Sequence, residues 1–427
     1  MISNWLSSVL SRRNVHYGWV MVLVTFLTAL VTAGAVGGTG VFIVPLQQEF
    51  GWSTAEISSA FSIRLILFGL MAPFAAALMN RYGLRNVALS ALLIIITASV
   101  ASLAMTKVWH LILLWGVVTG IGTGMTALVL GATVAARWFN ARRGLVIGLM
   151  TASNATGQLV FLPMLASVTD RFGWRIALSV TIALLLIGAT AVLMLMRDRP
   201  SDVGLRPFGD HGTEPLPTAA PVKAPIMAAA FGALKDAVRS KVFWVLFATF
   251  FICGASTNGL VQVHLIPLCG DFGIPQVQAA GLLAAMGLFD IVGTIASGWL
   301  SDRFDNRWLL FWYYGLRGLS LLALPFSDFS FYGLSLFAMF YGLDWFATVP
   351  PTVKLAAQRF GVERVGLVFG WIFTGHQLGA GFAAFGAGLS RTVLATYLPA
   401  FFFAGALCIV ASAIVVTIPT KATPARA

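Results

Sequence analysis

Charged side chains are scarce in this sequence. Asp, Glu, Lys and Arg together make up 10% of the 427 residues, whereas hydrophobic residues make up 59% and the mean hydropathy is +0.89. An ordinary soluble domain carries about 25% charged residues, so these charges are too few to cover a water-facing surface. The same figures exclude disorder and a collagen-like repeat. The composition therefore indicates a polytopic membrane protein.

Cysteine is also rare, with three residues at Cys253, Cys269 and Cys408. Each stands alone in an apolar stretch, without a CxxC pair or a histidine cluster, so we expect neither a disulfide nor a metal site. A Walker A loop, an HExxH motif and a nucleophile elbow are absent as well. We therefore expect a protein that has no cofactor and is not an enzyme.

Uncharged apolar runs between charged or turn-rich breaks predict twelve transmembrane helices. The first six cover residues 18–45, 55–79, 86–106, 109–136, 144–169 and 174–196. The second six cover 242–269, 278–300, 308–326, 330–357, 365–389 and 394–418. The intervening segment is rich in proline and charge, which is typical of a linker. We therefore expect a six-helix half at 1–196, a central loop at 197–241 with a short amphipathic helix near 228–238, and a second six-helix half at 242–427.

The basic residues predict the orientation of these spans. Of the 27 Lys and Arg residues, 20 fall in loops on the side of the two termini, four fall on the opposite side and three lie inside spans. Positive residues concentrate in the cytoplasm, so we expect both termini and the central loop to be cytoplasmic in a cell membrane, most simply the bacterial inner membrane. The net charge of +12 then requires no nucleic-acid partner.

The chain also matches itself at a single offset of 222 residues. The string VPLQQEFG at 44–51 aligns with IPLCGDFG at 266–273, and Asn80-Arg81 aligns with Asp302-Arg303. An offset that recurs in several spans indicates two six-helix halves in parallel orientation. Repeats of this kind enclose a site near the bilayer midplane and work by rocking one half against the other.

The loop after the eighth predicted span, GWLSDRFDNR at 298–307, resembles the G-x-L-x-D-R-x-G-R-R loop of the major facilitator superfamily. The twelve spans and the 6+6 repeat extend this resemblance to the whole chain. It implies an all-α fold of two six-helix pseudo-repeats and transport by alternating access. In that superfamily the acidic residue latches onto the N-terminal end of a neighbouring helix. The resemblance thus implies gating loops at Asn80, Arg81, Asp302 and Arg303, with a weaker latch at Asn80, which supplies no charge.

A finer resemblance is to the monocarboxylate and oxalate–formate branch of that superfamily. It depends on Tyr17-Gly18-Trp19 and on RWFNARRGLVIGL at 137–149, at the start of the fifth span. Asp290 also stands where that branch places an intramembrane aspartate. The chain departs from the branch at Thr294, where monocarboxylate members carry an arginine, and at 36–40, where they carry a lysine.

Five charged residues lie well inside predicted spans: Arg64, Asp290, Arg317, Asp344 and Lys354. Each costs about 2.5–3.5 kcal/mol at the bilayer centre and needs a partner or a water-filled cavity. Asp290 and Arg317 are equally far from the turn between their helices, which predicts a structural ion pair. In the alternative, Asp290 is a proton carrier whose pKa changes when Arg317 moves or when substrate arrives.

Arg64 lies near mid-depth without a carboxylate in its own helix, so it is our candidate for binding an anionic substrate. Its alternative is a structural role, paired with Asp344 or with backbone carbonyls. Asp344 is a second candidate proton site, and Pro350-Pro351 should break its helix because each proline removes a donor.

Neutral polar residues recur at helical spacing in the spans. We expect the substrate cavity to be lined by Asn154, Gln158, Asn258, Gln262, His376 and Gln377. His376 is also a candidate proton carrier, because histidine titrates near physiological pH; the alternative is a core histidine with satisfied hydrogen bonds.

The function that these features predict is secondary active transport of a small organic anion, a mono- or dicarboxylate, coupled to protons. The alternative is an efflux carrier for apolar or cationic small molecules. The expected partners are the small-molecule substrate, the proton and the lipid bilayer, and we expect a monomer. A 45-residue central loop is too short for the output domain of a receptor. The sequence also lacks a ring of like charges, which would indicate a channel.

Overall fold

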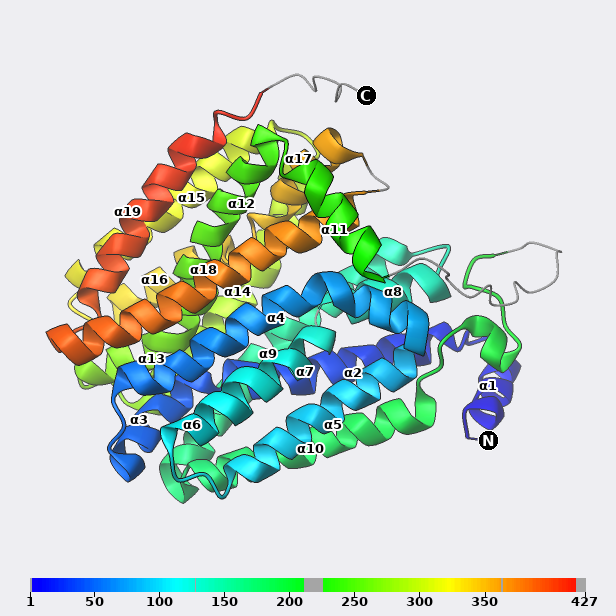
Figure 1. Ribbon diagram of the computed structural model, residues 1–427, viewed down its shortest axis with the longest axis horizontal. Helices are drawn as coiled ribbons and strands as arrows, with labels where there is room; N and C mark the ends of the chain where they lie inside the picture. Colours follow the sequence, from blue (N-terminus) through cyan, green and yellow to red (C-terminus); the bar gives the residue numbers. More distant parts are fainter. Residues whose placement is uncertain (1, 127, 211–225, 362–363, 420–427) are drawn as a thin grey trace.

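The structure is a computed structural model that describes residues 2–126, 128–210, 226–361 and 364–419 (Figure 1). In these ranges the chain is almost entirely helical. It begins with a short helix, α1 (Ile2–Arg12), that precedes the first span. The helices that follow form two groups of six spans, joined by the central loop.

The first group consists of residues before the central loop. Its spans are α2 (Gly18–Gly37) with α3 (Thr39–Phe50); α4 (Thr54–Tyr82); α5 (Leu84–Ser102); α6 (Val108–Leu111) with the π-helix η1 (Ile112–Val118), α7 (Thr119–Thr126) and α8 (Leu128–Trp138); α9 (Arg143–Phe172); and α10 (Trp174–Leu195). The central loop carries a 3-10 turn, η2 (Pro200–Val203), and α11 (Ile226–Ala237).

The second group follows the central loop. Its spans are α12 (Lys241–Gly254) with the π-helix η3 (Ala255–Val261) and α13 (Gln262–Asp271); α14 (Gln276–Ser301); α15 (Asn306–Ala323) with the 3-10 turn η4 (Leu324–Phe326); α16 (Phe331–Asp344) with α17 (Val349–Phe360); α18 (Val365–Leu394); and α19 (Leu398–Val415). Among the described residues, eight of the helical runs are long and apolar enough to cross a membrane.

The helix bounds repeat with the offset that the sequence predicts. Helix α4 begins at Thr54 and α14 at Gln276, and α9 begins at Arg143 and α18 at Val365. Each of these pairs is 222 residues apart, as are the starts of α5 and α15. Buried hydrophobic residues form two clusters, one mainly in each group of spans. The prediction of two six-helix pseudo-repeats is therefore confirmed, and they are called the N half and the C half below.

Local sequence explains where the helices begin and end. Ser53 starts α4 with a capping box, in which its hydroxyl accepts from the Glu56 N–H at 3.2 Å and the Glu56 carboxylate accepts from the Ser53 N–H at 2.8 Å. Gly51 ends α3 with a φ of +70°, a conformation that costs glycine nothing. Short polar turns of this kind reverse the chain between spans.

An even number of crossings places α1 and the end of α19 on one side of the membrane, called the terminal side here; the other is the distal side. The halves meet where α4 packs along α18 and where α9 packs along α14. Figure 1 shows α4 and α18 side by side across the middle of the molecule. Near the distal end of this contact, the Ala55 N–H donates to Thr392 Oγ1 at 3.0 Å.

The first span of each half closes the distal side. Helix α3 packs against α13, and Gln276 Nε2, at the start of α14, donates to the Val41 carbonyl oxygen at 2.6 Å. On the terminal side, α11 of the central loop lies against both α4 and α18. Its Phe231 ring is 5.8 Å from that of Phe74 on α4 and 5.7 Å from that of Trp371 on α18. The central loop thus contacts both halves.

Candidate functional site

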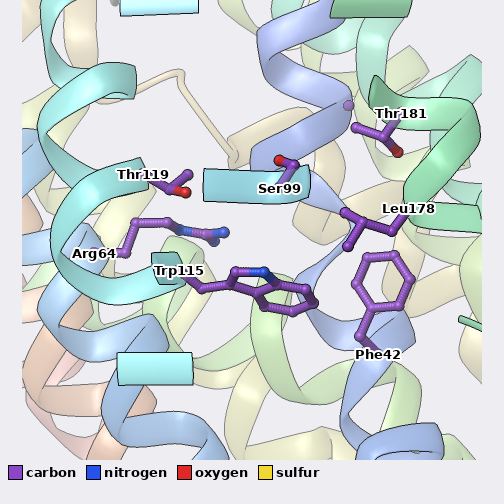
Figure 2. Close-up of a pocket in the computed structure, with 8 residues that line it drawn as sticks. Phe42, Arg64, Ser99, Trp115, Thr119, Leu178 and Thr181 are labelled. Atoms are coloured by element: carbon purple, nitrogen blue, oxygen red, sulfur yellow. The ribbon is translucent and has the colours of Figure 1, made fainter. Parts of the chain in front are cut away.

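A small cavity inside the N half contains Arg64. It is walled by spans 1, 2, 3, 4 and 6, and Figure 2 shows the guanidinium of Arg64 extending into it above the Trp115 ring. The lining residues are Gly34, Phe42, Arg64, Ser99, Trp115, Thr119, Leu178 and Thr181. The cavity volume of about 20 Å³ is enough for one or two water molecules. In this state the cavity is therefore too small for an organic substrate.

The position of Arg64 follows from the close packing of α4 and α7. A Cβ added at Gly120 would lie 3.1 Å from the Arg64 Cα, so the glycine lets the two backbones approach. Arg64 is 3% exposed, and its guanidinium carbon lies 5.6 Å from the centre of the Phe61 ring. The result is a buried cation with an aromatic neighbour, ten residues into α4 and therefore about 15 Å along it.

Three hydroxyls, from Ser99, Thr119 and Thr181, also line this cavity, together with the indole of Trp115, whose N–H donates to Ser102 Oγ at 2.9 Å. Thr119 Oγ1 donates to the Leu114 carbonyl at 2.8 Å, a contact across the π-helix η1. Thr181 Oγ1 donates to the Ala177 carbonyl at 3.1 Å. Their oxygens keep lone pairs, so the cavity offers one cationic fork of donors and several acceptors.

A second polar cluster lies in the C half, centred on Arg317. Its Nε donates to Asp344 Oδ2 at 2.6 Å, and the Arg317 side chain is fully buried. Its Nη1 contacts the Cys253 sulfur at 2.8 Å. The prediction that Arg317 pairs with Asp290 is therefore wrong, because its partner is Asp344. The alternative pairing of Arg64 with Asp344 is not seen either.

Asp290 has two other partners. Its Oδ1 accepts from the Thr294 hydroxyl and from the Phe346 N–H, each at 2.9 Å. Both donors are neutral, so Asp290 binds a backbone N–H of span 10 and not the guanidinium of Arg317. Helix α16 ends at Asp344 and α17 begins at Val349, after a break that the two prolines at 350 and 351 predict. This break brings Asp344 to Arg317 and exposes the backbone groups that Asp290 and Arg317 bind.

The predicted neutral polar residues lie on α9, η3, α13 and α18. The side chains of Asn154 and Gln158 on α9 lie outside the described residues. Gln262 is buried and Asn258 half-buried, and within the described part of the chain Asn258 Oδ1 has no hydrogen-bond partner.

His376 and Gln377 are both buried on α18, but they face different neighbours. The His376 ring lies 4.9 Å from that of Phe250 on α12. The side chain of Gln377 lies beside Gly69 of α4, at the contact between the halves. Among the residues that the structure describes, His376 Nδ1 and both amide atoms of Gln377 lack a hydrogen-bond partner.

The predicted gating loops lie at the terminal ends of α4 and α14. Asn80 Oδ1 accepts from Arg137 Nη2 at 2.6 Å, and the Arg81 guanidinium lies over the Tyr82 ring. Asp302 accepts from the Lys354 ammonium at 2.8 Å. This hydrogen bond, with the positive charge of Lys354, lowers the pKa of Asp302.

Asp302 therefore contacts an ammonium group, and not the helix end that the resemblance implies. Its neighbour Arg303 lies over the Trp299 ring at 4.0 Å. In the N half a helix end is instead capped by a carboxylate that no sequence motif singles out. Asp198 of the central loop accepts from the Arg85 N–H, in the first turn of α5, at 3.0 Å.

Comparison with known proteins agrees with this architecture. The family model of the Major Facilitator Superfamily matches residues 25–384 and 270–427. The chain is 26% identical to an uncharacterized MFS-type transporter, YcxA, of Bacillus subtilis, covering 88% of this chain and 89% of that protein. It is also 26% identical to monocarboxylate transporter 13 of Rattus norvegicus, covering 94% of this chain and 89% of that protein.

Among solved structures, the crystal structure of a D-xylose–proton symporter superposes with a TM-score of 0.68 at 13% identity. The match covers 94% of this chain and 98% of the symporter. At this identity the likeness concerns the fold alone. Two six-helix halves, buried charges inside the spans and a family match over most of the length lead to one conclusion: the chain belongs to the Major Facilitator Superfamily and is a multi-pass membrane transporter.

Proposed function

We propose that this transporter carries a small organic anion, a mono- or dicarboxylate, and that proton movement is coupled to it. The observation that carries the proposal is the guanidinium of Arg64, buried at mid-span in a cavity that is also lined by the hydroxyls of Ser99, Thr119 and Thr181. The planar fork of arginine matches a carboxylate with two parallel hydrogen bonds. Relatives named monocarboxylate transporters support the same class of substrate.

In this proposal Arg64 binds the negative group and moves with the N half. The rest of the substrate contacts polar side chains of both halves, which we propose to be Asn154, Gln158, Asn258, Gln262, His376 and Gln377. The buried amide of Gln377 supports this, because its two polar atoms lack a partner in the described part of the chain and a burial of that kind is costly. A ligand or water would supply the missing hydrogen bonds.

The proposed proton carriers are Asp344, Asp290 and His376. Asp344 is favoured by its Oδ1, which has no hydrogen-bond partner among the described residues, whereas its Oδ2 binds Arg317. Moving an anion inward against a negative-inside potential costs about 2.3 kcal/mol per charge per 100 mV. A co-transported proton cancels this cost, so an importer of anions gains from symport.

The alternative function, efflux of apolar or cationic compounds, requires a carboxylate that faces the ligand. The two intramembrane aspartates are engaged otherwise: Asp344 with Arg317, and Asp290 with Thr294 and Phe346. The geometry therefore favours an anionic substrate.

We further propose that the protein is a monomer in the bacterial inner membrane. The basic loops support an orientation with both termini in the cytoplasm.

Uptake by the purified protein in liposomes tests the proposed function. Labelled monocarboxylates and dicarboxylates are compared with a lipophilic cation, each with and without an inward proton gradient. We expect saturable uptake of at least one carboxylate, accelerated by the gradient, and none in liposomes without protein. Transport of the cation without any carboxylate would instead establish the efflux function.

A further inference from the structure

Span 10 is broken in the middle of the membrane. Residues 345–348 separate α16 from α17, so backbone groups that a continuous helix would pair internally are released. Such groups are expensive in hydrocarbon, and broken helices survive only where other protein groups satisfy them. The groups that hydrogen-bond to the backbone of these four residues therefore show how the break is stabilised.

The last turn of α16 is capped by a side chain of the neighbouring span. Arg317 of α15 donates from Nη2 to the Asp344 carbonyl at 2.5 Å and to the Trp345 carbonyl at 3.2 Å. A cation is the favoured group at the C-terminal end of a helix, where free carbonyls gather. The same guanidinium reaches the Asp344 carboxylate through Nε, so one side chain holds both the backbone and the side chain of this residue.

The backbone that leads into α17 is held by α14 of span 8. Asp290 accepts from the Phe346 N–H, two residues before Thr348, the N-cap residue of α17. An anion is the favoured charge near this end of a helix. Farther along the same face of α14, the Ser297 hydroxyl donates to the Ala347 carbonyl at 2.5 Å. Gly293 permits this contact, because a Cβ there would lie 1.8 Å from the Leu343 carbonyl oxygen.

We propose that Arg317 and Asp290 are positioning residues: Arg317 caps the end of α16, Asp290 holds the backbone just before α17, and together they fix the angle between the two half-helices of span 10. The two charges complement opposite helix ends, which explains why they lie at the same depth without binding each other. Helix α17 carries Lys354, which binds Asp302 and the Ser301 carbonyl at the terminal end of α14. The angle at the break therefore determines how this gating loop is held.

This inference depends on the fold and not on the proposed substrate or proton coupling, and its test needs no ligand. Spin labels are attached at Tyr332→Cys on α16 and Gln358→Cys on α17, both exposed positions, in the full-length protein in lipid nanodiscs. The three native cysteines are buried. Pulsed electron paramagnetic resonance then measures the distance across the break, and hydrogen exchange measures the protection of residues 345–349.

With the contacts of both Arg317 and Asp290 intact we expect a narrow distance distribution. Asp290→Leu should broaden or shift it and should speed exchange at residues 345–349 by about tenfold, because the Phe346 N–H loses its acceptor. Asp290→Asn should restore the narrow distribution, since an amide oxygen still accepts. Arg317→Lys should give an intermediate result, because an ammonium cannot bind the Asp344 carboxylate and both carbonyls together.

The matched control is Ser330→Ala, which removes the N-cap of α16 at its other end and should leave the distance across the break unchanged. If Asp290→Leu does not fold, Thr294→Val replaces it, since it removes the hydroxyl that orients Asp290 at nearly constant volume. An unchanged distance distribution and unchanged exchange in the folded Asp290 or Thr294 variant and in Arg317→Lys would overturn the proposal.

Discussion

Gly40 of α3 and Val263 of α13 meet across the two halves, so closely that a Cβ at residue 40 would lie 2.7 Å from the Val263 carbonyl oxygen. The obstructing atom belongs to the backbone and cannot rotate away. Together with the Gln276–Val41 hydrogen bond, this contact closes the distal side in the state described here.

The close contact predicts that Gly40→Val disfavours this state. Overpacking costs about 1–3 kcal/mol. A cost of this size lowers the population of the closed state, relative to a state with the distal side open, at least about fivefold. A cysteine placed at Val41, buried here, should then react faster with a membrane-impermeant thiol reagent added on the distal side. Gly270→Val is the control, because a Cβ at that position meets nothing within 4 Å. Equal labelling rates in both variants would contradict the prediction.

Replacement of Arg64 should weaken the binding of the carboxylate identified by uptake. Hydrogen bonds to charged groups contribute about 1.5–3 kcal/mol, so Arg64→Ala should lower affinity at least tenfold, and Arg64→Lys should also impair transport because a point charge lacks the fork. Calorimetric titration gives the affinities. Arg171→Lys, at an exposed position in the last turn of α9, is the control. Unchanged affinity in Arg64→Ala would rule out the role.

The buried pair of Arg317 and Asp344 predicts a non-additive effect on stability. Removing one partner leaves an uncompensated buried charge and costs about 3–5 kcal/mol, whereas Arg317→Met with Asp344→Leu removes both charges. Thermal unfolding in detergent should therefore give a lower Tm for each single variant than for the double variant. Arg364→Met, which breaks the exposed pair with Asp236, should change Tm little. Additive losses would contradict the expectation.

Proton coupling should depend on an intramembrane carboxylate or on His376. The measurement is the alkalinisation outside proteoliposomes during uptake, for the wild type and for Asp344→Asn, Asp290→Asn and His376→Gln. The carrier's variant should lose alkalinisation while still exchanging labelled for unlabelled carboxylate, because exchange needs no net proton movement. Wild-type uptake that is indifferent to the pH gradient would exclude symport and indicate a uniporter or an exchanger.

The sequence predicts well what depends on position along a helix. Hydropathy places the spans, and the offset of 222 residues places the start of α14 from that of α4. Counting from a shared turn also predicts that Asp290 and Arg317 lie at one depth. It cannot predict which of several neighbours at that depth a side chain faces, and Arg317 faces Asp344 of the adjacent span.

The same reason explains what was missed around Arg64. Ser99 and Thr181 line its cavity from spans 3 and 6. Each is one of several hydroxyl residues in an apolar helix, and no spacing distinguishes it from the others. Thr119 belongs to a threonine series at helical spacing, but that series alone does not reveal the π-helix beside it. Lateral packing, and not sequence pattern, assembles this site.

Each ion pair found among the described residues lies within one half, lies within the central loop, or joins that loop to the C half. None of them joins the N half to the C half. The contacts between the halves described above are hydrogen bonds of neutral groups and close backbone packing. Separating such surfaces does not pull opposite charges apart. Dissolved salt screens charge–charge attraction and leaves neutral contacts almost untouched. The conformational exchange of the empty carrier should therefore proceed at nearly the same rate in dilute and in concentrated electrolyte.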